Sequence, residues 1–451
     1  MTMDWKSREL PALAADTHSP ADARVEAVIA AMPDGGLFAG KDWLWSPEPF
    51  VLSPKEWTVL EGLGQRLWKF VQACDNIYRR SARGKLPAWI HELMDAGKPD
   101  WLLDGARSVG RDGEWPRVLR PDLVLTHDGF AMTELDSLPG GIGLLAWLNE
   151  AYARLGYPVV GGADGMLTGF ASLFDGPAEI AVSREGADYR PEMEWVAGQL
   201  AAAGRDIRVV DAETHLPGDR EVYRFFELFD WKNLPNLKTQ FNAWTSGGYT
   251  ITAPFKPWLE EKSWLALLWS APLQEHWDLA LRRAQKEALQ SIVPFGWVVD
   301  PSPMPPHGVL PRLNVQSWDA VAGFSQKHRE LVLKVSGFSE IGWGARSVVI
   351  GHDVPHQKWK DAVAEAVQAY LVNPWIMQEF KHARVVRHRF VDRVTGEIRT
   401  MDAMARITPY YFAGRDGVVR LGGVHATLCP SDKKILHGMR DAIMVPCVIG
   451  P

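Results

Sequence analysis

Three carboxylates lie on one short segment that reads as a β-hairpin. Residues 120–136 form two strand-like runs joined by Asp128-Gly129, a common two-residue turn. Glu134 and Asp136 are two residues apart and therefore share one face of their strand, which Asp122 on the partner strand can also reach. Because Mg²⁺ is usually held by one or two carboxylates plus substrate phosphates, the segment predicts a magnesium site made by Asp122, Glu134 and Asp136.

A lysine at the end of a short apolar strand precedes a glycine-rich loop. Residues 331–335 predict the strand, and a second strand at 347–350 makes the whole a flap. Backbone N–H groups of such a loop form an anion-binding nest, and Lys334 adds a point charge for phosphates. The spacing matches neither a P-loop nor a Rossmann glycine motif. We expect the loop to close over a triphosphate, and the loop residues predicted to contact it are Ser336, Gly337, Ser339, Gly342 and Gly344.

These motifs, in this order, resemble the circularly permuted group of the ATP-grasp family, which includes glutathionylspermidine-synthase-like proteins. The resemblance spans most of residues 115–451. Its motifs are Arg120-Pro-Asp122 with Glu134-Leu-Asp136-Ser-Leu-Pro139-Gly140, then Glu261-Lys262-Ser263, then Lys334 with its loop, then Gln378-Glu379-Phe380. Two positions depart from the family pattern: Asp136 stands where Asn is usual, and Val335 follows the lysine where Pro is common. An Asp still ligates Mg²⁺, so the first departure leaves metal binding intact.

The resemblance implies an α/β (α+β) fold, namely an ATP-grasp fold in circularly permuted order with a Rossmann-like pre-ATP-grasp domain and an N-terminal helical lobe. It implies ATP and Mg²⁺ as cofactors. It also implies that a carboxylate and ATP give an acyl phosphate, which an amine attacks to form an amide or peptide bond, with ADP and phosphate as products. In such a reaction the protein mainly positions the groups and neutralises charge.

The resemblance assigns roles to individual residues as well. Arg120 would contact the transferring phosphoryl group or the tetrahedral intermediate, because a planar guanidinium fits these groups bidentately. Lys262 and Lys334 would hold the triphosphate. The adenine would be framed by the hinge residues Gln378, Glu379, Phe380 and Lys381.

Basic residues beyond the hinge have two readings. Arg387 and Arg389 share a strand face, and Arg406 could join them from a neighbouring strand. The cluster is either a solvated sheet face or a site for a phosphate or an acidic substrate, in which Arg387 and Arg406 would be catalytic. The later segment with His425, Lys433, Lys434 and His437 reads as C-terminal packing, with a functional role as the alternative.

The order of predicted elements divides the chain into four parts. Residues 1–115 predict a helical lobe that includes a capping box at Ser53-Pro-Lys-Glu56. Residues 116–156 carry the metal-ligand hairpin. Alternating strands and helices in 157–254 predict a small parallel Rossmann-like domain, and 255–451 would be the ATP-grasp domain.

Composition narrows the class of protein. The 451 residues are 46% hydrophobic and 23% charged, which is typical of ordered globular proteins. A net charge of −6 argues against general nucleic-acid binding. The three cysteines lack C-x-x-C spacing, and no apolar run is long enough for a signal peptide or a membrane span. We therefore expect a cytoplasmic enzyme with small-molecule or peptide carboxylate and amine substrates.

Two other functions remain open at the level of sequence. The chain could be a catalytically silent or regulatory nucleotide-binding scaffold, although retention of three metal carboxylates and two lysines argues against lost activity. It could also be a phosphotransferase that releases a phosphorylated product, which nothing in the sequence excludes.

Overall fold

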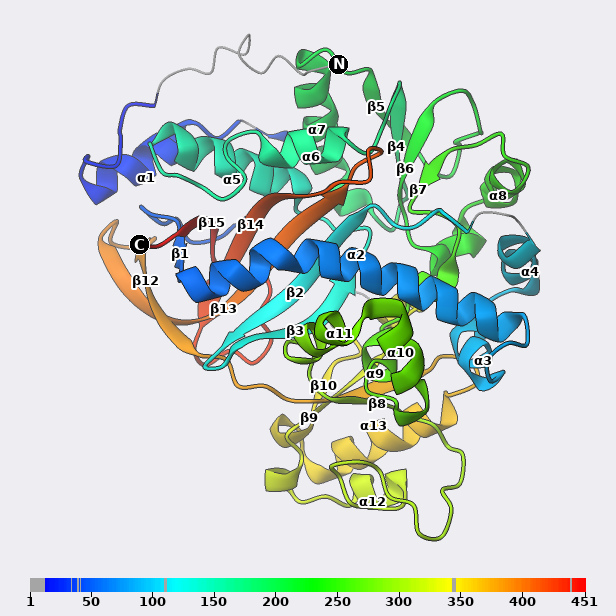
Figure 1. Ribbon diagram of the computed structural model, residues 1–451. Coiled ribbons are helices and arrows are strands. Elements are labelled where there is room, and N and C mark those ends of the chain that lie inside the picture. Colours follow the sequence, from blue (N-terminus) through cyan, green and yellow to red (C-terminus); the bar gives the residue numbers. More distant parts are fainter. Residues whose placement is uncertain are drawn as a thin grey trace.

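The computed structural model describes residues 13–33, 35–38, 40, 42–108, 112–342, 346–438 and 440–451. It is a mixed α/β fold built on three sheets. Figure 1 shows the largest sheet at the centre, a parallel sheet at one side and a small antiparallel sheet below. No helix in the described ranges combines the length and the apolarity needed to cross a membrane.

The central sheet brings together strands from both halves of the chain. Its order is β1-β15-β14-β13-β2-β3, with β12 paired to β13 outside this path, and only the β1–β15 pair is parallel. The predicted hairpin is therefore confirmed, and it lies beside strands that follow it by more than 250 residues. The strands are β1 (Phe50–Leu52), β2 (Val118–Thr126), β3 (Gly129–Asp136), β12 (Val385–Val391), β13 (Ile398–Ala413), β14 (Val419–Pro430) and β15 (Ile443–Ile449).

The two faces of β13 meet different helices. Tyr411 faces α2 (Pro54–Ala82), and Phe412 faces α6 (Gly165–Ala171), each with its ring against a glycine of the helix. Successive side chains of a strand point to opposite faces. Arg406, Thr408 and Tyr410 therefore lie on the face turned away from α2, and they line a cavity together with the first turn of α5 (Ile142–Arg154).

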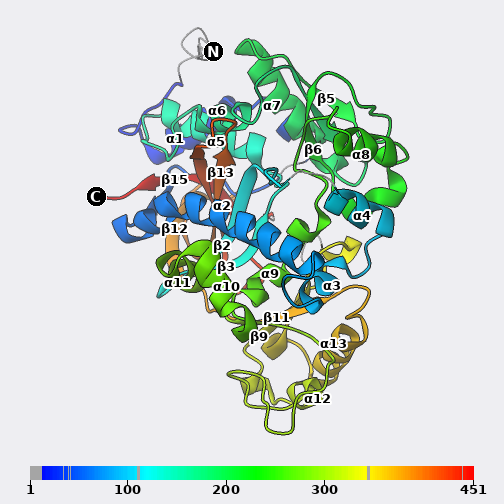
Figure 2. The same ribbon diagram turned by 45° about the vertical axis from the view of Figure 1, so that its right-hand side comes forward.

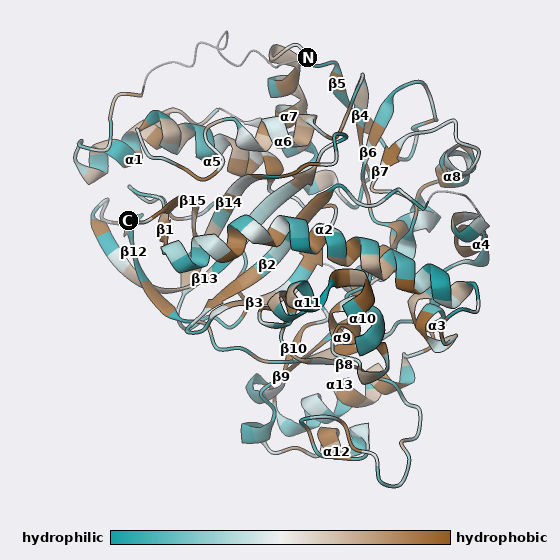
Figure 3. Ribbon diagram, viewed as in Figure 1, coloured by the Kyte–Doolittle hydropathy of each residue, from teal (hydrophilic) through white to brown (hydrophobic). Residues whose placement is uncertain are grey.

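Helix α2 spans one face of the central sheet (Figures 1 and 2). Ser53 accepts a hydrogen bond from the Glu56 backbone N–H, and the Glu56 carboxylate accepts one from the Ser53 N–H, which confirms the predicted capping box. Hydrophobic and hydrophilic residues alternate around the helix (Figure 3), and residues such as Leu60, Leu63 and Leu67 are buried against the strands. This packing anchors the N-terminal region to the sheet that carries the carboxylates.

The small antiparallel sheet has the order β10-β9-β11-β8. Leu331, Leu333 and Val335 of β9 pack into a core with α12 and α13. Lys334 alternates with them and so points to the opposite face, toward the central sheet. The elements are β8 (Gly296–Val298), β9 (Leu331–Val335), β10 (Val349–Ile350), β11 (Trp375–Glu379), α12 (Trp318–Ala322) and α13 (His356–Gln368).

The third sheet is parallel throughout, in the order β5-β4-β6-β7, as strand–helix–strand alternation predicted. Its elements are β4 (Ala178–Val182), α7 (Arg190–Ala202), β5 (Ile207–Asp211), β6 (Glu221–Phe225), α8 (Leu237–Thr245) and β7 (Ile251–Thr252). The remaining helices are α1 (Ala21–Ala30), α3 (Trp89–Asp95), α4 (Asp100–Ser108), α9 (Ser263–Leu267), α10 (Gln274–Leu281) and α11 (Arg283–Gln290). The helical segment 260–290 is divided into three short α-helices, with Pro272 in the first break and a positive φ of 61° at Arg282 in the second. The four-part division of the chain remains a prediction.

Two glycines of α2 offer a test of this packing. A Cβ added at Gly64 would lie 2.3 Å from the Tyr411 ring, whereas at Gly62 the nearest atom is Arg66 Nη1 at 2.8 Å, the end of a flexible side chain. We expect Gly64→Ala to lower the free energy of unfolding by about 1–3 kcal/mol through overpacking. Gly62→Ala should raise it by up to about 1 kcal/mol, because alanine is the better helix former. Denaturant unfolding of both variants checks this, and equal shifts would contradict a rigid contact between α2 and β13.

Candidate nucleotide and metal site

A cavity of about 930 Å³ lies where the three sheets meet. This volume is typical of small-molecule sites. Its floor is β2, β3 and β13, and its other walls come from the small antiparallel sheet, the parallel-sheet region and the C-terminal segment. The predicted site residues that line it are Arg120, Asp122, Glu134, Asp136, Lys262, Lys334, Gly337, Ser339, Gly342, Gln378, Glu379, Phe380, Lys381 and Arg406.

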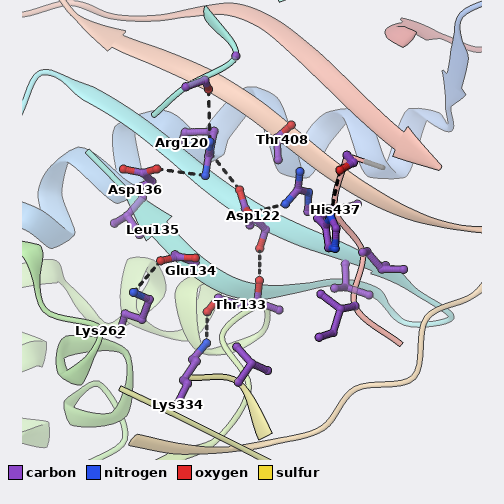
Figure 4. A pocket seen from close by; sticks show the side chains of 18 of the residues that line it. Arg120, Asp122, Thr133, Glu134, Leu135, Asp136, Lys262, Lys334, Thr408 and His437 are labelled. Carbon is purple, nitrogen blue, oxygen red and sulfur yellow. Dashed lines mark hydrogen bonds and ion pairs between the residues drawn. The ribbon is translucent and has the colours of Figure 1, made fainter. Parts of the chain in front are cut away.

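The hairpin register sets the three carboxylates side by side on the floor (Figure 4). Arg120 pairs with Asp136 across the two strands, and Asp122 pairs with Glu134. A bulge follows Asp122, so that Thr133 has no direct partner and also lines the cavity. Such bulges re-aim side chains next to a site.

Arg120 lies between two of the carboxylates. Its guanidinium is 3.0 Å from Asp122 and 3.1 Å from Asp136. Burial lowers the pKa of the Arg120 guanidinium, but the charges of Asp122 and Asp136 outweigh this and raise the pKa well above its usual value. The pKa of Asp136 is itself raised, mainly by burial, against the opposing effect of Arg120. Arg120 is therefore a fixed cation among partly compensated acids.

Glu134 and Lys262 form an ion pair 2.7 Å long across the cavity. Lys262 stands immediately before α9, and its Nζ also approaches the Gly342 carbonyl at 3.4 Å. Burial opposes both charges, but the pair lowers the pKa of Glu134 and raises the pKa of Lys262. Both groups are thus held charged where a phosphate or metal could exchange partners with them.

Lys334 reaches the same place from the opposite wall. Its Nζ donates a hydrogen bond to the Thr133 carbonyl. Burial lowers the pKa of Lys334 to about 8; Glu134 opposes this fall, while Lys262 adds to it. This lysine therefore carries a charge at neutral pH that only a bound anion would compensate fully.

The predicted grouping of Arg387 with Arg406 is wrong. Arg406 lies 3.2 Å from Asp122 on the cavity floor. Arg387 is opposite Asp402, four residues earlier on β13, and its side chain is 77% exposed with Asp402 at 3.6 Å. Strand register, which the sequence alone does not set, separates the two arginines. Of the two interpretations, only that of a solvated sheet face therefore remains for Arg387.

Ser336, one of the loop residues predicted to contact a triphosphate, instead fixes the loop after β9 to α9. Ser336 is fully buried and does not line the cavity; its Oγ accepts hydrogen bonds from the Ser263 N–H and hydroxyl at 2.9 and 2.8 Å. Ser339, in contrast, lines the cavity, and its hydroxyl accepts a hydrogen bond from Asn373 at 3.0 Å. Ser336 therefore anchors the loop instead of contacting a ligand. Gly344 lies outside the described residues.

The predicted hinge forms an apolar end of the cavity with Val332, Ile350 and Pro294. Gln378 is buried, and its amide nitrogen has no hydrogen-bond partner within the described ranges. Glu379 pairs with Lys381 at 2.9 Å and with Arg312 at 2.7 Å. An unpartnered donor beside apolar walls suits the edge of a heterocyclic base.

Sequence reasoning undervalued the C-terminal side of the cavity. His425, Lys434 and His437, read as packing, line it together with Thr408 and Tyr410. Burial, with help from Arg406 and Arg120, lowers the pKa of His425 to about 3, so its ring is neutral. Its Nε2 has no hydrogen-bond partner in the part of the chain described. The alternation of β13 and β14 was the available signal, but their pairing was needed to read it.

The carboxylates fit a metal ion that arrives with phosphates. The three carboxylates predicted to make a magnesium site, Asp122, Glu134 and Asp136, do not lie close enough together to hold an ion by themselves, and no other three His, Cys, Asp or Glu residues among those described do so. Mg²⁺ requires fewer, because it is usually bound through one or two carboxylates, water and substrate phosphates. Asp122, Glu134 and Asp136 are hard oxygen donors on one cavity floor, and Lys262 and Lys334 line the same cavity.

The lowered pKa of Lys334 has a consequence for stability. Between about pH 8 and the ordinary lysine pKa of 10.5, the unfolded chain binds a proton that the folded chain does not. Stability from this group therefore rises with pH in that window, by about 3 kcal/mol at most. Between pH 7 and 10, we expect the free energy of unfolding of the wild type to rise relative to that of Lys334→Met, as measured by denaturant unfolding. The exposed Lys55→Met is the control, and parallel curves for wild type and Lys334→Met would contradict the shift.

Comparison with known proteins finds likeness in structure but not in sequence. No family model matches the chain, and no curated protein matches it. The solved apo form of a glutathione synthetase-like effector from Globodera pallida gives a TM-score of 0.52 at 11% identity, covering 90% of each chain. A Methylobacillus flagellatus protein assigned as a γ-glutamylcysteine synthetase gives 0.39 at 10% identity, covering 86% of each chain. The first likeness shows a shared fold, and the second is too distant to add to it.

Proposed function

We propose that this chain is an ATP-dependent carboxylate–amine ligase that forms an amide or peptide bond through an acyl phosphate and releases ADP and phosphate. One observation carries the proposal. Two lysines from separate elements, Lys262 and Lys334, face three carboxylates of one hairpin across a cavity with an apolar end. That arrangement matches the charge pattern of a metal–triphosphate with an attached base.

The proposed binding mode follows from the walls of the cavity. The base lies among Val332, Ile350 and Phe380, where the Gln378 amide is available to its edge. The triphosphate extends toward Lys334 and Lys262, and Lys262 exchanges Glu134 for a phosphate oxygen. One or two of the carboxylates Asp122, Glu134 and Asp136, together with the phosphates, would hold Mg²⁺, which supplies positive charge against the phosphates.

The proposed chemistry needs little covalent work from the protein. Arg120 offers a guanidinium to the transferring phosphoryl group and to the oxyanion formed when the amine attacks. Arg406, beside Asp122, orients the donor carboxylate. The loop after β9 helps to exclude water, which would otherwise hydrolyse the acyl phosphate.

The proposal includes the finer fold assignment. An ATP-grasp fold in circularly permuted order accounts for a metal hairpin that precedes Lys262, Lys334 and the hinge in sequence. The fold shared with the glutathione synthetase-like effector supports this assignment. The substrates proposed are a small or peptide carboxylate and an amine.

Substitutions in the hairpin test whether its charged residues are catalytic or only structural. Glu134→Gln should lower ADP release at least about a hundredfold, because a charge that serves the transition state is lost. Asp128→Asn, at the exposed tip of the same hairpin, should leave it unchanged. Arg120→Ala should reduce turnover with ATP affinity nearly intact. The measurement is ATP affinity by calorimetry and ADP release with panels of carboxylates and amines.

Each outcome of that measurement bears on the assignment. Normal turnover in Glu134→Gln and Arg120→Ala would make the hairpin structural and the ligase proposal wrong. ATP binding without stimulation by any carboxylate–amine pair would favour a silent or regulatory scaffold. A phosphorylated product that persists when amine is present would favour a phosphotransferase.

Two arginines that the sequence analysis grouped together serve as test and control. Arg406 lines the cavity and Arg387 is exposed. Arg406→Ala should raise the KM for the carboxylate at least about tenfold, since a guanidinium binds a carboxylate through paired hydrogen bonds. Arg387→Ala should change it less than twofold. Steady-state kinetics decide this, and equal effects would contradict the placement of the substrate beside β13.

A further inference from the structure

A lysine of the N-terminal lobe is buried at the root of the loop after β9. Lys98 lies in the turn between α3 and α4, and its side chain has no exposed surface. Its Nζ forms an ion pair with Glu261, whose side chain is 2% exposed. The same Nζ lies 5.0 Å from the centre of the Phe338 ring. A charge taken wholly out of water is costly and needs compensation at close range.

Glu261 connects Lys98 to residues next to the cavity. One of its carboxylate oxygens pairs with Lys98, and the other accepts a hydrogen bond from the Ser336 hydroxyl. The Ser336 carbonyl in turn accepts a hydrogen bond from the Lys262 N–H at 2.9 Å. Lys98 is therefore two contacts away from the start of the loop and adjacent in the network to Lys262.

The backbone around Lys98 is fitted to the same region. Gly97 has a φ of +72°, and a Cβ there would lie 2.0 Å from the Val372 carbonyl oxygen. Gly337 is equally confined, because a Cβ would lie 2.5 Å from the Glu260 carbonyl oxygen. The turn of the lobe thus packs against the segment before β11, and the loop packs against the segment before α9, without room for a side chain at either glycine.

We propose that Lys98 is a positioning residue, through which the N-terminal lobe fixes Glu261 and Ser336 and so sets the places of Lys262 and the loop root for an anionic ligand. The proposal rests on the proposed function, since it assigns the lobe a part in nucleotide binding. Lys98 does not line the cavity, so its role would be indirect.

The physical argument concerns the charge of Glu261. With Lys98 present, Glu261 is a compensated anion whose second oxygen is free to hold Ser336. Without Lys98, an uncompensated buried carboxylate would stand next to the residue that binds phosphates, and it would repel them. The Glu261 carboxylate would also lower its free energy by turning toward solvent. That movement would break its hydrogen bond with Ser336 and loosen the start of the loop.

A second buried ion pair between the lobe and the segment before α9 provides a matched control. Lys256 is also without exposed surface, and its Nζ lies 2.9 Å from Asp75, whose side chain is 3% exposed. This pair joins α2 to the segment before α9, and Lys256 Nζ also donates to the Glu114 carbonyl. Within the described residues, no hydrogen bond or ion pair links Lys256 to the loop after β9. A role in stability alone predicts equal consequences for Lys98→Met and Lys256→Met.

The experiment compares the two variants with wild type in the full chain. Hydrogen exchange of peptides covering 331–342 is measured without ligand, and affinity for ATP with Mg²⁺ is measured by calorimetry. Both variants should melt several degrees lower. Lys98→Met should speed exchange in 331–342 and weaken ATP binding at least about tenfold, whereas Lys256→Met should do neither. Equal exchange and affinity in the two variants would overturn the proposal.

A double variant tests the charge argument directly. Lys98→Met/Glu261→Gln removes both charges and leaves an amide oxygen that can still accept from Ser336. We expect it to recover most of the ATP affinity lost in Lys98→Met, as coupled neighbours do. Affinity as low as in Lys98→Met would overturn the electrostatic role of Lys98. If wild type binds no ATP, the proposed function fails, and exchange in the unliganded loop alone decides the positioning role.

Discussion

Mutual charge compensation inside one buried cavity is the constraint on which the arrangement of this chain depends. The hairpin contributes Asp122, Glu134 and Asp136, and it supplies only Arg120 to balance them. The remaining partners come from elsewhere in the chain: Arg406 from β13 of the same sheet and Lys262 from the residue before α9. A carboxylate buried without a partner is strongly unfavourable, so the hairpin is stable in this position only when β13 and α9 are also in place. Packing of β13 and α9 against the hairpin therefore stabilises the site charges as well as the fold.

Compensation among the cavity charges is incomplete in a way that favours anionic ligands. Lys262 is matched by Glu134, but Lys334 donates only to a backbone carbonyl and has its pKa lowered by burial. Of these two lysines, Lys334 has more to gain when a phosphate arrives. Lys262 must first give up a carboxylate, which in turn becomes available to a metal. Binding of nucleotide and metal would then be coupled through the Glu134–Lys262 pair.

Local patterns in the sequence predicted the elements well, and long-range pairing decided what they did together. The Asp128-Gly129 turn and the Ser53 capping box involve neighbours in sequence, so their residue types suffice. The predicted grouping of Arg387 with Arg406 was wrong because strand register decides which residues are neighbours. The role of Ser336 as an anchor depends on Glu261, which lies 75 residues away in sequence. Lys98 carried no signal, because one lysine in a turn between helices has no spacing to read.

The N-terminal lobe shows how residues without chemistry can still determine a site. Two ion pairs attach the lobe to the segment that leads into α9: Lys98 of the lobe binds Glu261, and Asp75 of the lobe binds Lys256. Trp258 lies between these two attachment points in sequence and donates a hydrogen bond to Asp75 at 2.9 Å. A lysine on a loose segment would bring its charge to a phosphate only at the cost of ordering that segment. Because the segment is already held at both ends, Lys262 starts from a fixed backbone, and less of the binding energy is lost to ordering.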